Sequence, residues 1–136
     1  MFKRLHGFNV GVKKENLEAA VENWSKVLGH EPIWLKSSDF AFPGILGAKF
    51  VIDGCWIAIL AGDNEKVSVA QFAEKGEGVF LVSFEVNSIP EEQELLASKG
   101  VKCILKEQAP FALGIVIFIH PRWMNGVQIE LITFNK

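Results

Sequence analysis

Hydrophobic and polar residues alternate along the chain in two ways, and each way predicts one kind of element. Runs with a period of two predict strands, and longer runs with apolar residues every three or four positions predict helices. The strand pattern covers residues 6–12, 32–36, 49–52, 55–61, 80–86, 101–105, 114–120 and 127–134. The helical pattern covers residues 16–28 and 90–98, and a shorter connecting helix is expected over 67–75.

Turn and capping residues mark several ends of these elements. Asn16 is a suitable N-cap and Gly29 a suitable C′ residue for the first helix. The pair Asp53-Gly54, which separates two strand runs, predicts a two-residue hairpin. Ser88 stands where the second long helix is expected to start.

The order of the elements repeats, so the chain contains two similar halves. Gly29 aligns with Gly100, and Gly54 aligns with Gly126 at nearly the same offset. Each half has the order β-α-β-β-β, which predicts an α+β fold. The expected boundaries are 1–136 for a single domain and about 1–65 and 77–136 for its two modules.

Alternate side chains of a strand point to opposite faces of a sheet, and the two faces differ in character here. One face is uniformly apolar and is expected to pack on the helices: Phe8, Val10, Val12, Cys55, Ile57, Ile59, Val82, Phe84, Val86, Val127, Ile129 and Leu131. The other face mixes small, polar and large apolar residues: Gly7, Asn9, Gly11, Trp56, Ala58, Leu60, Leu81, Ser83, Glu85, Gln128, Glu130 and Ile132. A concave, partly apolar pocket explains this mixture, and a solvent-facing sheet or a dimer interface are the alternatives.

Composition and charge exclude several classes of protein. Of the 136 residues, 49% are hydrophobic, and the aromatic ones are eleven Phe and four Trp with no Tyr, which excludes a disordered chain. The net charge of −2 and the absence of a basic cluster argue against a nucleic-acid partner. There is no apolar run of about 18 residues, which argues against a membrane span. Two cysteines form no disulfide framework, so a reducing, cytoplasmic location is expected.

Four segments resemble a known superfamily. They are VGVKKENLEAAVENWSKVLGHEP (10–32), VAQFAEKGEGVFLVSFEVNSI (69–89), LLASKGVKCIL (95–105) and FIHPRWMNGVQIELI (118–132). With the paired modules, they resemble the vicinal oxygen chelate superfamily, which includes glyoxalase I, bleomycin-resistance proteins and extradiol dioxygenases, and are most similar to methylmalonyl-CoA epimerases. The resemblance implies two βαβββ modules forming a curved mixed sheet around a cup, with helices on the outer face, and it implies a homodimer.

The resemblance also implies a divalent metal in the cup, held by one ligand from each of four inner strands. Carried over residue by residue, these positions fall on Gly7, Ala58, Leu81 and Glu130. Only Glu130 offers a side-chain ligand atom, and such sites need at least three protein ligands. We therefore predict that the cup holds no metal and that the protein uses no cofactor.

The histidines leave one alternative open, an atypical metal site built from His6 or His120. His6 lies one residue from the first ligand position, so its side chain should point to the helix-packed face unless a β-bulge intervenes. His120 ends a strand run and is expected at the rim, and His30 lies on a loop after the first helix.

Glu130 is the candidate catalytic residue. A carboxylate in an apolar cup should have a raised pKa, which makes it a general acid or base near neutral pH. The alternative is an inactive remnant that is hydrogen-bonded across the cup to Gln128, Asn9 or Ser83. The predicted ligand-binding residues are Asn9, Trp56, Ala58, Leu81, Ser83, Gln128 and Glu130.

Apolar loops are expected at the mouth of the cup. Residues 40–46 and 109–113 are unusually apolar for surface connections, and they either cover a ligand or form a dimer contact. Arg122 could meet an anionic group. The aromatic residues expected near the cup or its mouth are Trp34, Phe40, Phe42, Trp56, Phe111 and Trp123.

Three functions follow from these observations. The first is metal-free binding of a small apolar or carbonyl-containing molecule, and the second adds metal-independent isomerase, lyase or cyclase chemistry at Glu130. The alternative is a metal-dependent methylmalonyl-CoA epimerase or glyoxalase I-type lyase with an atypical site. We favour the first two together.

Overall fold

The strands form one continuous mixed sheet. A computed structural model describes residues 1–104 and 109–135. Within these ranges an eight-stranded sheet has the order β2-β3-β4-β1-β5-β8-β7-β6. The strands are β1 (Phe2–Gly11), β2 (Ile33–Trp34), β3 (Ile45–Ile52), β4 (Cys55–Gly62), β5 (Gly78–Val86), β6 (Ala109–Phe111), β7 (Gly114–Ile119) and β8 (Gln128–Phe134). The α-helices are α1 (Leu17–Leu28), α2 (Ser68–Lys75) and α3 (Ile89–Ser98), and short 3₁₀ helices are η1 (Lys14–Asn16), η2 (Ser37–Asp39) and η3 (Pro121–Trp123).

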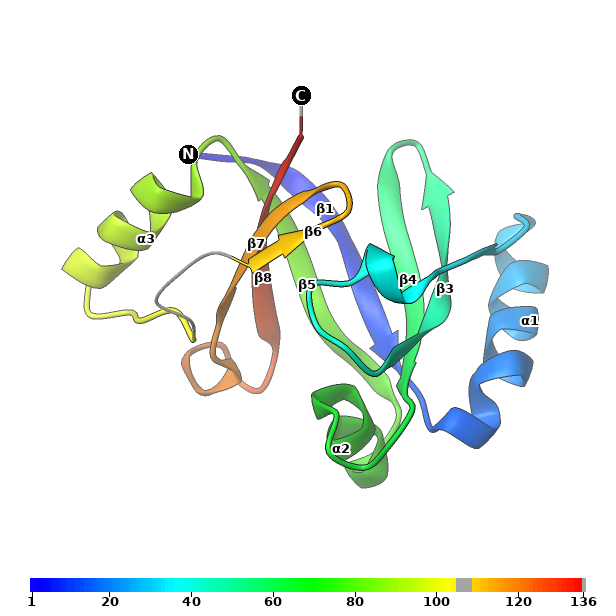
Figure 1. The fold of residues 1–136 in the computed structure, drawn as a ribbon. Helices are drawn as coiled ribbons and strands as arrows, with labels where there is room; N and C mark the ends of the chain where they lie inside the picture. The colour runs from blue at the N-terminus through cyan, green and yellow to red at the C-terminus, as the bar shows by residue number, and fades with distance from the viewer. Residues whose placement is uncertain (105–108, 136) are drawn as a thin grey trace.

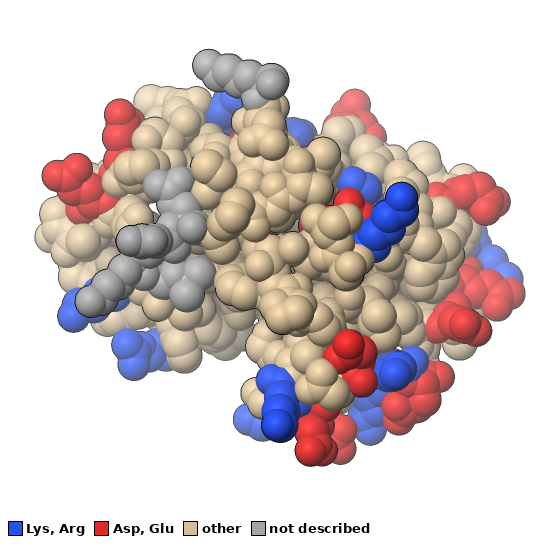
Figure 2. Space-filling model, viewed as in Figure 1, with Lys and Arg blue, Asp and Glu red and all other residues tan. Residues whose placement is uncertain are grey.

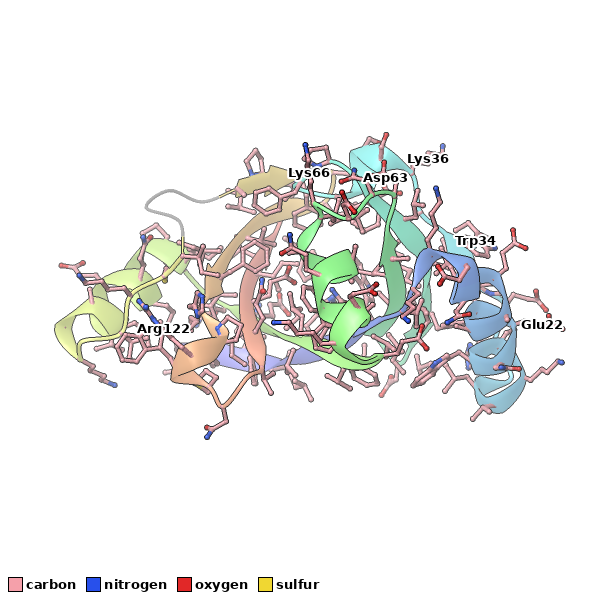
Figure 3. The ribbon with its side chains drawn as sticks, turned by 90° about the horizontal axis from the view of Figure 1, so that it is seen from below. Glu22, Trp34, Lys36, Asp63, Lys66 and Arg122 are labelled. Atoms are coloured by element: carbon pink, nitrogen blue, oxygen red, sulfur yellow. The ribbon has the colours of Figure 1, made fainter. Side chains whose placement is uncertain are left out.

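The sheet curls into a half-barrel, with α1 and α3 on its two outer flanks (Figure 1). Each half contributes a parallel pair, β1 with β4 and β5 with β8, and the antiparallel pairing of β1 with β5 joins the halves. The predicted α+β fold, a curved mixed sheet with helices outside, is confirmed. Helix α2 lies across one end of the half-barrel (Figure 3). In the described ranges, none of the helices is long and apolar enough to cross a membrane.

The apolar face of the sheet packs on the outer helices as predicted. In the first half, Val10 and Ile59 pack with Leu17 and Val21 of α1. In the second half, Ile129 and Leu131 form a cluster that includes Ile89 of α3. Burial of these side chains holds the helices to the convex side, so the concave side is left free for a cavity.

Local turn chemistry mostly agrees with the sequence. Gly29 has a left-handed φ of 69° and its N–H donates to the carbonyl of Ser25 at 2.9 Å. Asp53 and Gly54 have φ values of 49° and 78°, as the predicted two-residue hairpin requires. Asn16 stands at the N-cap position, but its side chain makes no cap hydrogen bond.

Three strand predictions need correction. The run 32–36 contributes only Ile33–Trp34 to the sheet. The run 101–105 contributes one isolated bridge, from Cys103 to Ile119, and residue 105 lies outside the described residues. The segment Ala109–Phe111 was expected to belong to an apolar loop, yet it forms the edge strand β6, which contains Pro110. An edge strand tolerates proline because one side of it needs no ladder hydrogen bonds.

Candidate functional site

A cavity of about 410 Å³ lies on the concave face of the sheet. Its volume falls within the range of small-molecule sites, roughly 300–1,000 Å³. Its lining is mostly aliphatic and aromatic, and the polar or charged residues in it are Asn9, Asp39, Lys49, Ser68, Gln128 and Glu130. A predominantly apolar wall with a few polar groups is typical of a site for a small organic molecule.

Strand register places the floor residues in two neighbouring rows, both on the concave face. The first row crosses the sheet from β3 to β8 through Lys49, Ala58, Asn9, Leu81 and Gln128. The second row crosses from β4 to β7 through Trp56, Gly7, Ser83, Glu130 and Phe118. Both halves of the chain therefore build the same floor.

The structure brings the predicted ligand-binding residues together. Those that line the cavity are Asn9, Trp56, Ala58, Leu81, Gln128 and Glu130. Ser83 is different, because only 4% of it is exposed and it is not part of the cavity wall. Its hydroxyl donates a hydrogen bond of 2.8 Å to Oε1 of Glu130. That these residues contact a ligand stays a prediction.

Glu130 has the electrostatic environment that the sequence predicts. Removal from water raises the pKa of its carboxyl to about 7, and the hydrogen bond from Ser83 opposes part of this rise. Of the three partners expected for it, Ser83 is the one that bonds; in the described residues neither Asn9 nor Gln128 does. Near pH 7 the group is divided between its two protonation states, so it can accept or donate a proton.

The apolar loops face the cavity. Phe40 and Phe42 from the first loop, and Phe111 and Leu113 from the second, all line it. The ring centroids of Phe42 and Phe118 are 5.8 Å apart. This arrangement supports the interpretation of the loops as a cover over a ligand.

Other residues expected near the mouth lie elsewhere. Trp34 and Trp123 are 51% and 43% exposed, and neither lines the cavity. Arg122 is not part of the wall either, and Figure 3 shows it on the opposite side of the molecule from Trp34. That Arg122 meets an anionic group stays a prediction, and such a group would have to lie outside the described cavity wall.

His6 does not point to the helix-packed face, because a bulge shifts the pairing of β1 with β5 between Leu5 and Gly7. The imidazole is buried between two aromatic rings, with centroid distances of 4.6 Å to Trp56 and 4.9 Å to Phe134. Its Nε2 has no hydrogen-bond partner among the described residues. Burial, with a smaller contribution from Arg4, lowers its pKa to about 4, so the ring is neutral at pH 7.

The other two histidines lie at the surface. His120 is exposed, and its Nδ1 accepts a hydrogen bond of 3.1 Å from the backbone N–H of Arg122. His30 is exposed after α1, where its carbonyl accepts a hydrogen bond from Ser25. Neither residue lines the cavity.

The residues at the implied metal positions do not fit a metal. A Cβ on Gly7 would lie 1.8 Å from the carbonyl oxygen of Trp56, so the backbone there excludes every side chain. Ala58 and Leu81 carry no ligand atoms. In the ranges that the structure describes, no three or more His, Cys, Asp and Glu side chains gather as a metal site would need. The prediction of a metal-free cup awaits direct metal analysis.

Lys49 is a cavity residue that the sequence reasoning missed. It lies on β3, its Nζ is 3.6 Å from the centroid of the Trp56 ring, and burial lowers its pKa. Its neighbours Ala48 and Phe50 are fully buried on the helix side. The strand alternation that was applied to four strands would have placed Lys49 on the concave face if it had also been applied to residues 45–52.

Comparisons with solved structures identify the fold. A methylmalonyl-CoA epimerase from Mycobacterium tuberculosis superposes with a TM-score of 0.84 at 24% identity, over 99% of this chain and 90% of that one. A methylmalonyl-CoA epimerase from Streptomyces coelicolor, in complex with 2-nitronate-propionyl-CoA, gives 0.84 at 23% identity over all of both chains. The chain has the fold of these methylmalonyl-CoA epimerases.

A hypothetical protein from Bacillus halodurans has the same fold, with a TM-score of 0.82 at 24% identity over 98% of this chain and 95% of that one. No family model and no curated protein matches the sequence. At these identities the comparisons establish the fold, and the chemistry has to be argued from the cavity itself.

Proposed function

We propose that the protein binds a small apolar molecule with a carbonyl group in the cup, and that Glu130 transfers a proton on it without a metal. The observation that carries this proposal is the position of Glu130, in the wall of an apolar cavity with a pKa of about 7. A carboxylate with this pKa is suited to remove a proton from a carbon next to a carbonyl group.

The surrounding residues support the same chemistry. Loss of the proton leaves negative charge on the carbonyl oxygen, and the amides of Asn9 and Gln128, which line the cavity, can donate hydrogen bonds to it. The Ser83 hydroxyl holds the carboxylate of Glu130 in place. Return of the proton to another atom is an isomerisation, its return to the other face is an epimerisation, and loss of a neighbouring group is a lyase reaction.

Glu130→Gln tests the catalytic part of the proposal. A panel of ketones, oxo acids and acyl thioesters, including a CoA thioester, is incubated with the protein in D₂O, and exchange at the carbon next to the carbonyl is followed by NMR. We expect exchange with the native protein and at least about a hundredfold loss in Glu130→Gln, because general acid-base groups contribute this much. Glu94→Gln, an exposed residue of α3, is the matched control.

The outcomes separate binding from catalysis. Exchange that is unchanged in Glu130→Gln removes Glu130 from catalysis. Binding without exchange for every compound leaves a metal-free binding protein, the first of the three functions. Mass spectrometry of small molecules that co-purify with the protein identifies the ligand directly.

The metal-dependent alternative agrees with the structural neighbours at least as well, because the neighbours include several methylmalonyl-CoA epimerases. The residues in the cup argue against a metal-dependent reaction, since Glu130 is the one residue at the four implied positions whose side chain can coordinate a metal. Elemental analysis of the purified protein decides between them. Stoichiometric zinc, cobalt, nickel or manganese that is lost in Glu130→Gln would establish the alternative and overturn our proposal.

The partners and location predicted from the sequence belong to the same proposal. They are a small-molecule ligand, no nucleic acid, a homodimer and the cytoplasm. Acidic and basic side chains are interspersed around the face shown in Figure 2, with no broad basic area, which supports the exclusion of nucleic acid. Analytical ultracentrifugation tests the homodimer.

A further inference from the structure

Lys49 is a cation on the wall of an apolar cavity. Its Nζ lies 3.6 Å from the centroid of the Trp56 ring. That ring is held by His6, at a centroid distance of 4.6 Å, and by Phe134, at 5.6 Å. Because the surface beneath the ammonium group is fixed, the position of the positive charge is fixed as well.

This cation has no ion-pair partner in the described part of the chain. Burial lowers the pKa of Lys49, and the negative charge of Asp39 opposes part of this lowering. Asp39 and Lys49 nevertheless form no salt bridge. The carboxylate of Asp39 instead accepts a hydrogen bond of 2.7 Å from the backbone N–H of Lys36. A half-buried ammonium group without a counter-ion is costly, and an anion in the cavity would remove that cost.

Lys49 and Glu130 stand on opposite walls. Lys49 is on β3 and Glu130 on β8, and β4, β1 and β5 lie between them. Four strand spacings of about 4.8 Å separate the two strands by roughly 19 Å along the curved sheet. Ala58, which lines the floor between them, has a small side chain and leaves room for the body of a ligand.

A single cation in the described wall favours a monoanion over a dianion. Lys49 is the one cation among the described residues that line the cavity, and Asp39 and Glu130 are the acids. A carboxylate balances one ammonium group. A phosphate dianion would leave a second negative charge without a partner in the described wall.

We propose that Lys49 binds the carboxylate of a small apolar acid, whose carbonyl end reaches Glu130 on the opposite wall. This inference rests on the proposed function and specifies its substrate class as oxo acids with an apolar body. Lys49 orients the ligand, and Glu130 remains the group that moves the proton.

Matched probes test the inference by calorimetry. 9-Oxodecanoate carries a carboxylate and a ketone at opposite ends of an apolar chain, and its methyl ester lacks the charge. We expect the acid to bind about tenfold to a hundredfold tighter than the ester, since a hydrogen bond to a charged group is worth that much. In Lys49→Met the preference for the acid over the ester should disappear, while the affinity for the ester stays unchanged. In Lys49→Arg the preference should largely return. It should persist in Lys26→Met, the control at an exposed lysine of α1.

Each other outcome overturns the inference in a recognisable way. Equal binding of acid and ester by the native protein overturns the role of Lys49 but leaves the proposed function intact. If Lys49→Met weakens the binding of the acid and of the ester equally, Lys49 has only a packing role and the inference is overturned. Tighter binding of the corresponding phosphonate overturns the choice of a carboxylate, and failure of both acid and ester to bind overturns the inference together with the proposed function.

Discussion

Ser83 donates a hydrogen bond of 2.8 Å to Glu130 from the adjacent parallel strand. The two residues are register partners on β5 and β8, so the backbone pairing itself sets their side chains next to each other. Burial raises the pKa of Glu130 and this hydrogen bond lowers it, with burial the larger effect. The balance leaves the pKa at about 7, where proton transfer is most useful.

Removing the Ser83 hydroxyl should raise the pKa of Glu130. In Ser83→Ala the carboxylate loses the donor that stabilises its charge, and we expect an increase of about one unit. NMR titration of the Glu130 side-chain carboxyl measures it. Ser68→Ala, which also removes a hydroxyl from the cavity region, should leave the titration unchanged; an equal shift in both variants would contradict the assignment.

Glu130 should make the protein less stable as the pH rises. Its pKa is about 7 in the fold against an ordinary value of 4.5, so the folded state binds more protons between these values. Stability from this group is complete below pH 4.5 and falls as the pH rises through 7, and the full loss amounts to about 3 kcal/mol. Chemical denaturation at pH 5 and pH 8 should show a smaller loss in Glu130→Gln than in the native protein, and equal losses would contradict this.

His6 should have the opposite effect at acid pH. Its pKa falls from 6.5 to about 4, so the unfolded chain binds the proton more readily, and stability is lost as the pH falls through this window. Between pH 7.5 and pH 5 the loss is about 2 kcal/mol. His6→Phe keeps the aromatic packing on Trp56 and removes the titration, so denaturation curves at these two pH values should differ less than for the native protein.

Gly7→Ala should be strongly destabilising, because its Cβ would meet the backbone oxygen of Trp56 at 1.8 Å. We expect a loss of about 3 kcal/mol or more in the free energy of unfolding. Gly11→Ala on the same strand is the control, since its Cβ would meet the ring of Phe72 at 2.9 Å, and a side chain can move. A loss of about 1 kcal/mol is expected there. Equal losses would show that the backbone contact is not what makes Gly7 necessary.

Much of the fold could be predicted from the sequence because local signals and burial agree. The alternation of apolar residues predicted which side chains lie on each face of the sheet, and the pair Asp53-Gly54 predicted the hairpin. Strand β6 was not predicted, because proline in a short run such as 109–111 disfavours a strand. Pro110 is tolerated there because β6 lies at the edge of the sheet.

The site was predictable where residues follow regular alternation and was missed where they do not. Glu130, Asn9 and Gln128 obey the period of two and were placed on the concave face. The orientation of His6 depends on a bulge, which arises from pairing between distant strands and leaves no local signal. The position of Lys49 on the cavity wall could have been predicted by applying the same period of two to one more strand, β3.

The close approach of β1 to β4 at Gly7 also limits which residues this position can carry. At this position, where the resemblance implies the first metal ligand, no single substitution can introduce a histidine without a clash, because its Cβ would lie 1.8 Å from the carbonyl oxygen of Trp56. The strand would first have to move away from Trp56, and that movement would disturb the row that sets Asn9 beside Ala58. Point mutation at this position therefore cannot by itself supply a metal ligand, and variants with altered specificity are better sought among the apolar residues of the cup.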